Sequence, residues 1–189
     1  RRGPKVEITE PWLCPALDSS DVKENLRDAE QIADLVEALK VNDDAVDDSG
    51  LAALVRPLLE FGKPLFVDMK MDKGSRTMAE RARKAAELGV TLINAYARAD
   101  RLLKGPVSAL EGTQTKLLGV TVLTHHGEEY CQEYHRRSLL ETVLFLSKKA
   151  VYFGCHGIIL PVPTLSAVRD LQIIKATPGI RPKWAEKSA

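Results

Sequence analysis

The stretch Pro64-Leu65-Phe66-Val67-Asp68-Met69-Lys70-Met71-Asp72 decides the fold of this chain. Its consecutive apolar residues are typical of a strand that is buried on both faces, as the strands of parallel sheets are. Because strand side chains alternate between faces, Asp68, Lys70 and Asp72 share one face if the strand stays extended. Charges at the end of a buried strand are unfavourable unless they pair or take part in chemistry, so the pattern predicts a functional site here.

Short apolar runs alternate with longer amphipathic segments along the whole chain, which is typical of βα units and a parallel sheet. No linker rich in Pro and Gly interrupts the pattern, so we expect a single domain over residues 1–189. The expected strands are Trp12–Leu17, Ala38–Val41, Pro64–Lys70, Thr91–Ala95, Leu117–Leu123, Gly157–Leu160 and Ile173–Ala176. The expected helices are Asp21–Glu37, Gly50–Phe61, Thr77–Leu88, Arg98–Leu103, Ser138–Phe153 and Thr164–Leu171.

Residues that favour helix ends stand beside several of these segments. Ser20 and Ser49 are expected to cap the first two helices, because a hydroxyl oxygen can accept a hydrogen bond from a free backbone N–H group. Gly62, Gly89 and Gly154 stand where helices should end, because glycine adopts the left-handed conformation without strain.

Charged residues follow several strands, namely Asp18 after the first, Lys40 in the second, and Asp68 and Lys70 at the third. In a barrel the carboxyl ends of all strands converge on one mouth, whereas an open sheet spreads them along an edge. Convergence favours an α/β fold of the TIM (β/α)8 barrel type. The last residues, Lys183–Ala189, are polar and not strand-like, so we expect the barrel to lack its last strand, with the sequence truncated at its end.

Composition narrows the class of protein. The 27 Lys and Arg residues nearly balance the 26 Asp and Glu residues, and no apolar run reaches the length of a membrane span. We therefore expect neither a nucleic-acid polymer nor a membrane as partner. Three cysteines, Cys14, Cys131 and Cys155, lack disulfide or zinc spacing, so a reducing, cytoplasmic setting is expected. His125, His126, Cys131 and His135 match no standard metal site, and we expect no metal.

Four motifs then stand in order along the chain: Cys14-Pro15-Ala16-Leu17-Asp18, Leu39-Lys40-Val41, Asp68-Met69-Lys70 and Thr177-Pro178-Gly179-Ile180-Arg181-Pro182. Their order and spacing resemble the orotidine 5'-phosphate decarboxylase family, over residues Trp12 to Pro182. The resemblance implies a TIM-barrel homodimer of pyrimidine biosynthesis. Such an enzyme makes uridine 5'-monophosphate from its nucleotide substrate with no metal or organic cofactor.

The resemblance also implies roles for individual residues. Asp18 and Lys40 would contact the ribose hydroxyls and support the array of charges, Asp68 would lie beside the substrate carboxylate, and Lys70 would donate the proton. Among the substrate-binding residues, Thr124 would place a hydroxyl at the pyrimidine, and Thr77 would reach the partner's site. Pro161 stands at a position of the sixth-strand motif where serine is common. Gly179 would form a turn at the phosphate, and Arg181 would hold the phosphate.

This sequence departs from the family pattern after the third strand. The family's acid that crosses to the partner's active site is replaced here by Lys73, and Asp72 stands one residue earlier. Arg76 replaces an asparagine, and Asp72 is expected to take over the catalytic acid role by a shifted turn. Two alternatives stay open: a magnesium-dependent sugar-phosphate decarboxylase or hexulose-phosphate synthase of the same superfamily, and a non-catalytic nucleotide-binding barrel.

Overall fold

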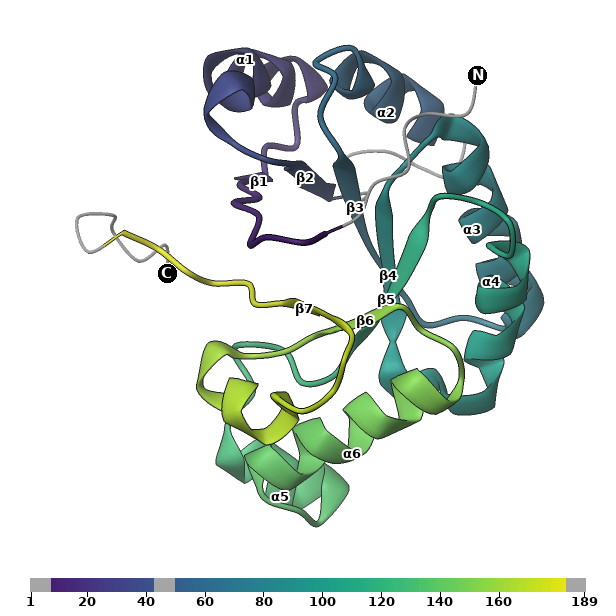
Figure 1. Cartoon of the computed structure of the whole chain (residues 1–189), viewed down its shortest axis with the longest axis vertical. Coiled ribbons are helices and arrows are strands. Elements are labelled where there is room, and N and C mark those ends of the chain that lie inside the picture. Colours follow the sequence, from purple (N-terminus) through teal and green to yellow (C-terminus); the bar gives the residue numbers. More distant parts are fainter. Residues whose placement is uncertain (1–7, 43–49, 183–189) are drawn as a thin grey trace.

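A computed structural model of the chain describes residues 8–42 and 50–182 (Figure 1). Within these residues seven parallel strands form one sheet, in which each strand pairs with the next along the sequence. This order confirms the predicted α/β fold and places each of the seven expected strands. The strands are β1 (Ala16–Leu17), β2 (Leu39–Asn42), β3 (Leu65–Met71), β4 (Leu92–Tyr96), β5 (Lys116–Val120), β6 (Gly157–Ile159) and β7 (Ile174–Ala176).

The helices lie around the outside of the curled sheet (Figure 1). The α-helices are α1 (Val22–Ile32), α2 (Leu51–Leu59), α3 (Ser75–Leu88), α4 (Lys104–Ala109), α5 (Glu128–His135) and α6 (Leu139–Tyr152). Three 3₁₀ helices are η1 (Ala33–Leu35), η3 (Ala97–Leu103) and η4 (Val162–Val168). None of the helices in the described part of the chain is long and apolar enough to cross a membrane.

The helix ends follow the predicted chemistry, with one correction. Gly62, Gly89 and Gly154 have φ values of 70°, 87° and 90°, as expected for residues that end helices. The expected cap at Ser20 is wrong, because the Asp21 carboxylate instead accepts a hydrogen bond from the Lys23 backbone N–H at 2.8 Å. The expected cap at Ser49 lies outside the described residues.

The sheet is curled but not closed within the described residues, because β1 pairs only with β2, and β7 only with β6. Within the described residues, a curled parallel sheet of seven strands with helices on its outer side has the (β/α) barrel architecture, as predicted (Figure 1). The expected first strand is shortened to Ala16–Leu17, and Leu13 before it is exposed. The polar segment Lys183–Ala189 lies outside the described residues.

Apolar side chains pack on both faces of the sheet, which accounts for the continuous apolar runs of the strands. The larger cluster lies between the sheet and the helices and contains Val67 and Ile93 of the strands, and Leu54 and Met78 of the helices. The smaller cluster lies on the inner face and consists of Phe66, Leu92, Leu118, Val120 and Ile159.

Candidate active site

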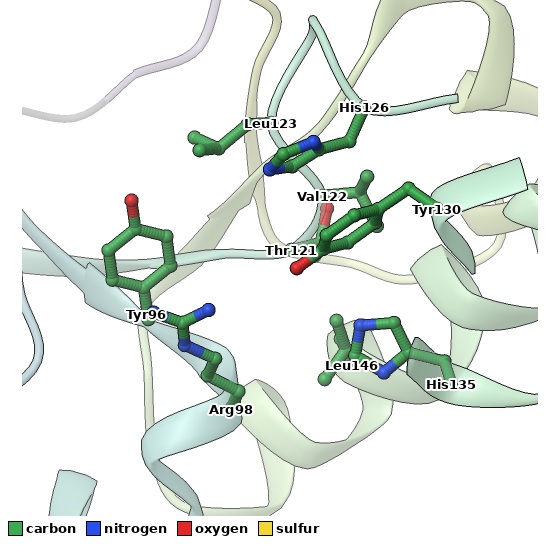
Figure 2. Close-up of a pocket in the computed structure, with 9 residues that line it drawn as sticks. All are labelled: Tyr96, Arg98, Thr121, Val122, Leu123, His126, Tyr130, His135 and Leu146. Atoms are coloured by element: carbon green, nitrogen blue, oxygen red, sulfur yellow. The ribbon is translucent and has the colours of Figure 1, made fainter. Parts of the chain in front are cut away.

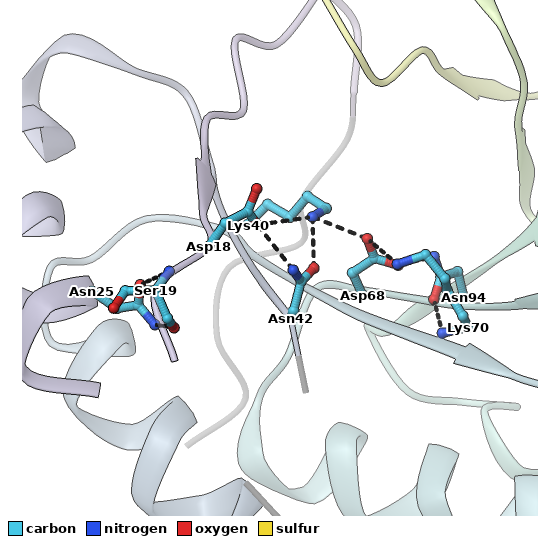
Figure 3. A network of polar contacts seen from close by, with 8 residues as sticks. All are labelled: Asp18, Ser19, Asn25, Lys40, Asn42, Asp68, Lys70 and Asn94. Carbon is cyan, nitrogen blue, oxygen red and sulfur yellow. Dashed lines mark hydrogen bonds and ion pairs between the residues drawn. The ribbon is translucent and has the colours of Figure 1, made fainter. Parts of the chain in front are cut away.

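The centre of the site is the carboxylate of Asp68, near the carboxyl end of β3 (Figure 3). Its Oδ2 atom lies 3.0 Å from Nζ of Lys40 on β2 and 2.9 Å from Nζ of Lys70. Only 9% of the Asp68 side chain is exposed, against 15% for Lys40 and 41% for Lys70. One buried carboxylate oxygen therefore holds two ammonium groups, and Lys70 is the one that solvent or a ligand can reach.

A second carboxylate extends the array at the end of β1 (Figure 3). Asp18 Oδ1 lies 3.8 Å from Lys40 Nζ and accepts a hydrogen bond from Asn42 Nδ2 at 3.0 Å. Lys40 also donates to Asn42 Oδ1 at 2.9 Å. The structure thus brings together four of the predicted residues, Asp18, Lys40, Asp68 and Lys70, with alternating charge. Asn42 was not predicted, and its only sequence signal is its position two residues after Lys40 in a strand.

Asn94 on β4 is a further member that sequence reasoning missed. Its amide nitrogen donates to Asp68 Oδ1 at 2.8 Å, and its amide oxygen accepts from the Lys70 backbone N–H at 2.7 Å. The side chain is buried, with 1% of the residue exposed. A single amide within the apolar run Leu92–Ala95 is the sequence signal that could have indicated it, because a buried amide needs partners.

The surroundings of Asp68 favour its ionised form. Burial alone would raise the pKa of this carboxyl. The charge of Lys40, together with hydrogen bonds from Asn94, Lys70 and Lys40, outweighs burial and holds the pKa of Asp68 below its ordinary value. At neutral pH the Asp68 carboxylate is therefore charged.

Asp72 lies apart from this array. Lys70 has a φ of 41°, so the strand does not stay extended and the condition for a shared face is not met. The Asp72 carboxylate instead accepts hydrogen bonds from Arg98 at 2.7 and 3.1 Å. The guanidinium of Arg98 lies 4.4 Å from the centre of the Tyr96 ring. Tyr96 is the last residue of β4 and Arg98 follows two residues later. Neither was predicted as a partner of Asp72.

A pocket adjoins Arg98 at the carboxyl ends of β4 and β5 (Figure 2). The ring of His126 stacks on that of Tyr130 with centroids 3.7 Å apart and planes 5° from parallel. Partial burial, together with the charges of His125 and Arg98, lowers the pKa of His126. The predicted loop histidines near the mouth are thus packed against aromatic rings. The residues that line the pocket are Tyr96, Arg98, Thr121, Val122, Leu123, His126, Tyr130, His135 and Leu146.

The predicted substrate-binding residues lie on separate elements around the mouth. A methyl group at Gly179 would lie 3.7 Å from Thr124 Cγ2, so the loop after β7 lies against the segment after β5. Gly179 has a φ of 83°, in the left-handed region that favours glycine. Pro161 is buried after β6, where its carbonyl accepts from the Thr164 hydroxyl at 2.7 Å. Arg181 is exposed beyond β7.

Thr77 lies on the first turn of α3, in the segment that follows β3. Its side chain is exposed, so it does not contribute to the array around Asp68 within this chain. Lys73 and Arg76 beside it are exposed as well. The segment that carries the departures from the family pattern therefore lies on the surface.

The three cysteines are free thiols, two of them buried and Cys14 partly buried. Burial raises the pKa of Cys14 to about 11, an effect that the charge of Lys40 partly opposes. Burial also raises the pKa of Cys155 to about 12. Thiolate chemistry at neutral pH is therefore disfavoured at both positions.

Comparisons with a family model and with individual proteins identify the same family. A model of the orotidine 5'-phosphate decarboxylase / HUMPS family matches residues 11–189. An orotidine 5'-phosphate decarboxylase of Wolbachia pipientis subsp. Culex pipiens (strain wPip) is 31% identical over 178 residues, which cover 90% of this chain and 77% of the relative. The decarboxylase of Geobacter sulfurreducens is also 31% identical, over 90% of this chain and 75% of that protein.

Comparison with solved structures supports the fold. The crystal structure of orotidine 5'-phosphate decarboxylase from Lactobacillus acidophilus superposes with a TM-score of 0.74 at 24% identity. The match covers 90% of this chain and 81% of that one. The barrel architecture inferred from the curled sheet is therefore shared with a solved structure.

Proposed function

Because the chain belongs to the orotidine 5'-phosphate decarboxylase / HUMPS family, we infer that it is a carboxy-lyase that converts orotidine 5'-monophosphate to uridine 5'-monophosphate in pyrimidine biosynthesis. The observation that supports this most is the Lys40–Asp68–Lys70 array at the mouth of the sheet. These charges come from two neighbouring strands, β2 and β3, and Asp18 follows β1 beside them, in the place where barrel enzymes carry their active sites.

We assign the proton transfer to Lys70. Loss of carbon dioxide from the pyrimidine leaves a carbanion at ring carbon 6, so a cation and a proton source are needed beside it. The Lys70 ammonium supplies both, and it is the more exposed of the two lysines that contact Asp68. Asp68 Oδ2 lies 2.9 Å from Lys70 Nζ and holds this ammonium at the mouth.

The role proposed for Lys40 and Asp18 is to balance charge and bind the ribose hydroxyls. Lys40 is tied to Asp68, Asn42 and Asp18 and is largely buried, so its ammonium is fixed in place. Asp18 is 61% exposed and can accept hydrogen bonds from a ligand. The charges of Asp18, Lys40, Asp68 and Lys70 sum to zero, so the two ammonium groups balance the two carboxylates.

Nucleotide binding is assigned to the loops around the same mouth. Thr124 and Gly179 lie close together, which supports a shared role at the base and phosphate ends of one ligand. Arg181 follows Gly179 by two residues, and a guanidinium there suits a phosphate group because it can donate two parallel hydrogen bonds. Pro161 completes the substrate-binding set at the end of β6.

We propose a homodimer formed by this one-domain chain in the cytoplasm. The exposed Thr77 is available to reach the active site of a partner, and the continuous sheet supports a single domain. The three free thiols support a reducing compartment. The catalytic acid role proposed for Asp72 requires it to leave Arg98 and approach Lys70 of the partner. Sedimentation equilibrium of the protein tests the assembly, and a monomer at micromolar concentration would exclude a crossing acid.

The experiment that tests the activity is the decay of orotidine 5'-monophosphate absorbance with purified protein. Turnover that persists in excess chelator agrees with the proposal, whereas activity that needs magnesium favours the sugar-phosphate alternative. Calorimetric titration with uridine 5'-monophosphate is run beside it. Binding without turnover would indicate the non-catalytic nucleotide-binding barrel.

A further inference from the structure

Strands β3 and β4 lose their register at the active site. Phe66 pairs with Leu92 and Val67 with Ile93, so regular pairing would continue from Asp68 to Asn94. The next observed pair is instead Met71 with Ala95. Four steps along β3 therefore match two steps along β4, and the two extra residues form a bulge that ends at Lys70. Bulges of this kind redirect side chains at functional sites.

The bulge places Lys70 in an unfavourable backbone conformation. Its φ of 41° lies in the left-handed region, which a residue with a side chain rarely adopts because its Cβ atom then lies too close to the backbone. Such a conformation persists only where surrounding contacts hold it. The contact present here is the hydrogen bond from the Lys70 N–H group to Asn94 Oδ1, which replaces the backbone pairing that the bulge interrupts.

The same amide fixes the orientation of Asp68. Asn94 Nδ2 donates to Oδ1 of the carboxylate, while Oδ2 faces the two ammonium groups of Lys40 and Lys70 (Figure 3). Rotation of the carboxylate would break three contacts together. Because an amide presents one donor and one acceptor, Asn94 can hold the carboxylate of Asp68 and the backbone of Lys70 at the same time.

We propose that Asn94 is the positioning residue of the decarboxylase: it holds the bulge of β3 so that Lys70 and Asp68 meet in the geometry needed for proton transfer. This inference rests on the proposed function, because the geometry matters only if Lys70 donates the proton. Asn94 acts through its two neighbours and needs no contact with the substrate. Its loss should therefore reduce kcat and leave the affinity for nucleotide nearly unchanged.

The test compares two substitutions on the same strand pair. Asn94→Ala removes both contacts, and Thr91→Val is the matched control, because the Thr91 hydroxyl also accepts from a β3 backbone N–H, that of Leu65, at the opposite end of β3. We expect kcat of Asn94→Ala to fall about 10²-fold, the effect of misplacing a reacting group by about 1 Å. Its dissociation constant for uridine 5'-monophosphate should stay within about twofold of wild type. Equal loss of kcat in both variants would overturn the proposal.

A second variant and a second measurement make the test independent of folding and turnover. Asn94→Asp keeps the acceptor for Lys70 but places an oxygen opposite Oδ1 of Asp68. Charges from three strands face Asp68, namely Lys40, Lys70 and the substituted residue, with Asp18 beyond Lys40. The NMR titration midpoint of the Asp68 carboxyl should rise in both Asn94 variants and stay constant in Thr91→Val.

The two failures are distinguishable. Absence of turnover in the wild-type protein refutes the proposed function, and the Asp68 titration then decides the role of Asn94 by itself. An Asp68 midpoint that is the same in wild type, Asn94→Ala and Asn94→Asp overturns the positioning role. Wild-type turnover with unchanged kcat in the Asn94 variants overturns it as well and leaves the proposed function standing.

Discussion

Asp68→Asn is expected to lower the stability of the protein substantially. It removes the charge that lies 3.0 Å from Lys40 Nζ and 2.9 Å from Lys70 Nζ, and it leaves the two ammonium groups near each other. Lys40 is only 15% exposed, so water replaces the lost contact poorly. Removing one partner of a buried ion pair costs about 3–5 kcal/mol. For a chain of this size, each kcal/mol lost from the free energy of unfolding lowers Tm by about 2–4 °C, so the Tm of Asp68→Asn should be about 6–20 °C below that of wild type.

The matched control is Asp72→Asn, the same chemical change four residues along the chain. Asp72 pairs with Arg98 at 41% and 52% side-chain exposure, and such pairs contribute at most about 1 kcal/mol. Differential scanning calorimetry of wild type and both variants at neutral pH provides the comparison. If Asp68→Asn lowers Tm no more than Asp72→Asn does, the reasoning that Asp68 holds the array together is refuted.

The pH dependence of the same comparison has a defined sign. The pKa of Asp68 is lower in the folded protein than its ordinary value of 3.8. Its charge therefore contributes stability that is fully present above the unfolded value and is lost as the pH falls through the lower folded value. The difference in Tm between wild type and Asp68→Asn should shrink below about pH 4. A difference that stays constant to pH 2 would contradict the assignment.

Further predictions concern the phosphate, the thiols and the assembly. Arg181→Ala should weaken calorimetric binding of uridine 5'-monophosphate about tenfold or more, because a charge-assisted hydrogen bond is lost, whereas Arg169→Ala should not; equal affinities would remove Arg181 from the site. The pKa of Cys14 is about 11 instead of 9.0. Its alkylation by iodoacetamide at pH 8 should therefore be about a hundredfold slower in the folded protein than in denaturant. Comparable rates in the two conditions would show an exposed thiol. Thr77→Arg should weaken the dimer in sedimentation equilibrium; an unchanged dissociation constant would place Thr77 outside the interface.

The sheet was predictable because its strands have a simple physical signature. Apolar runs buried on both faces, such as Leu65–Val67, differ clearly from amphipathic helices, and all seven strands were located. Two helices were missed. In α5 only Cys131 is buried, so the segment Glu128–His135 shows no apolar periodicity. The other missed helix is α4, which directly follows η3. Asp100 within η3 has a φ of 58°, which interrupts the helical segment, and such an interruption cannot be derived from apolar periodicity.

The charged part of the site was predictable and its amides were not. Asp18, Lys40, Asp68 and Lys70 follow from charge at strand ends, because buried charges must pair. Asn42 and Asn94 depend on which side chains meet across neighbouring strands, and that is decided by the register. Because of the bulge at Lys70, Asp72 lies apart from the array and pairs with Arg98. Regular alternation would instead place Asp68, Lys70 and Asp72 on one face.

The most direct test of the account measures turnover of orotidine 5'-monophosphate by wild-type protein and by Lys70→Ala, together with calorimetric binding of uridine 5'-monophosphate to both. A proton donor acts on the developing carbanion, so its loss should fall on the chemical step and spare product binding. We predict turnover by wild type without added metal, no detectable turnover by Lys70→Ala, and similar affinities for the product. Turnover by Lys70→Ala at the wild-type rate would contradict the central claim that Lys70 donates the proton.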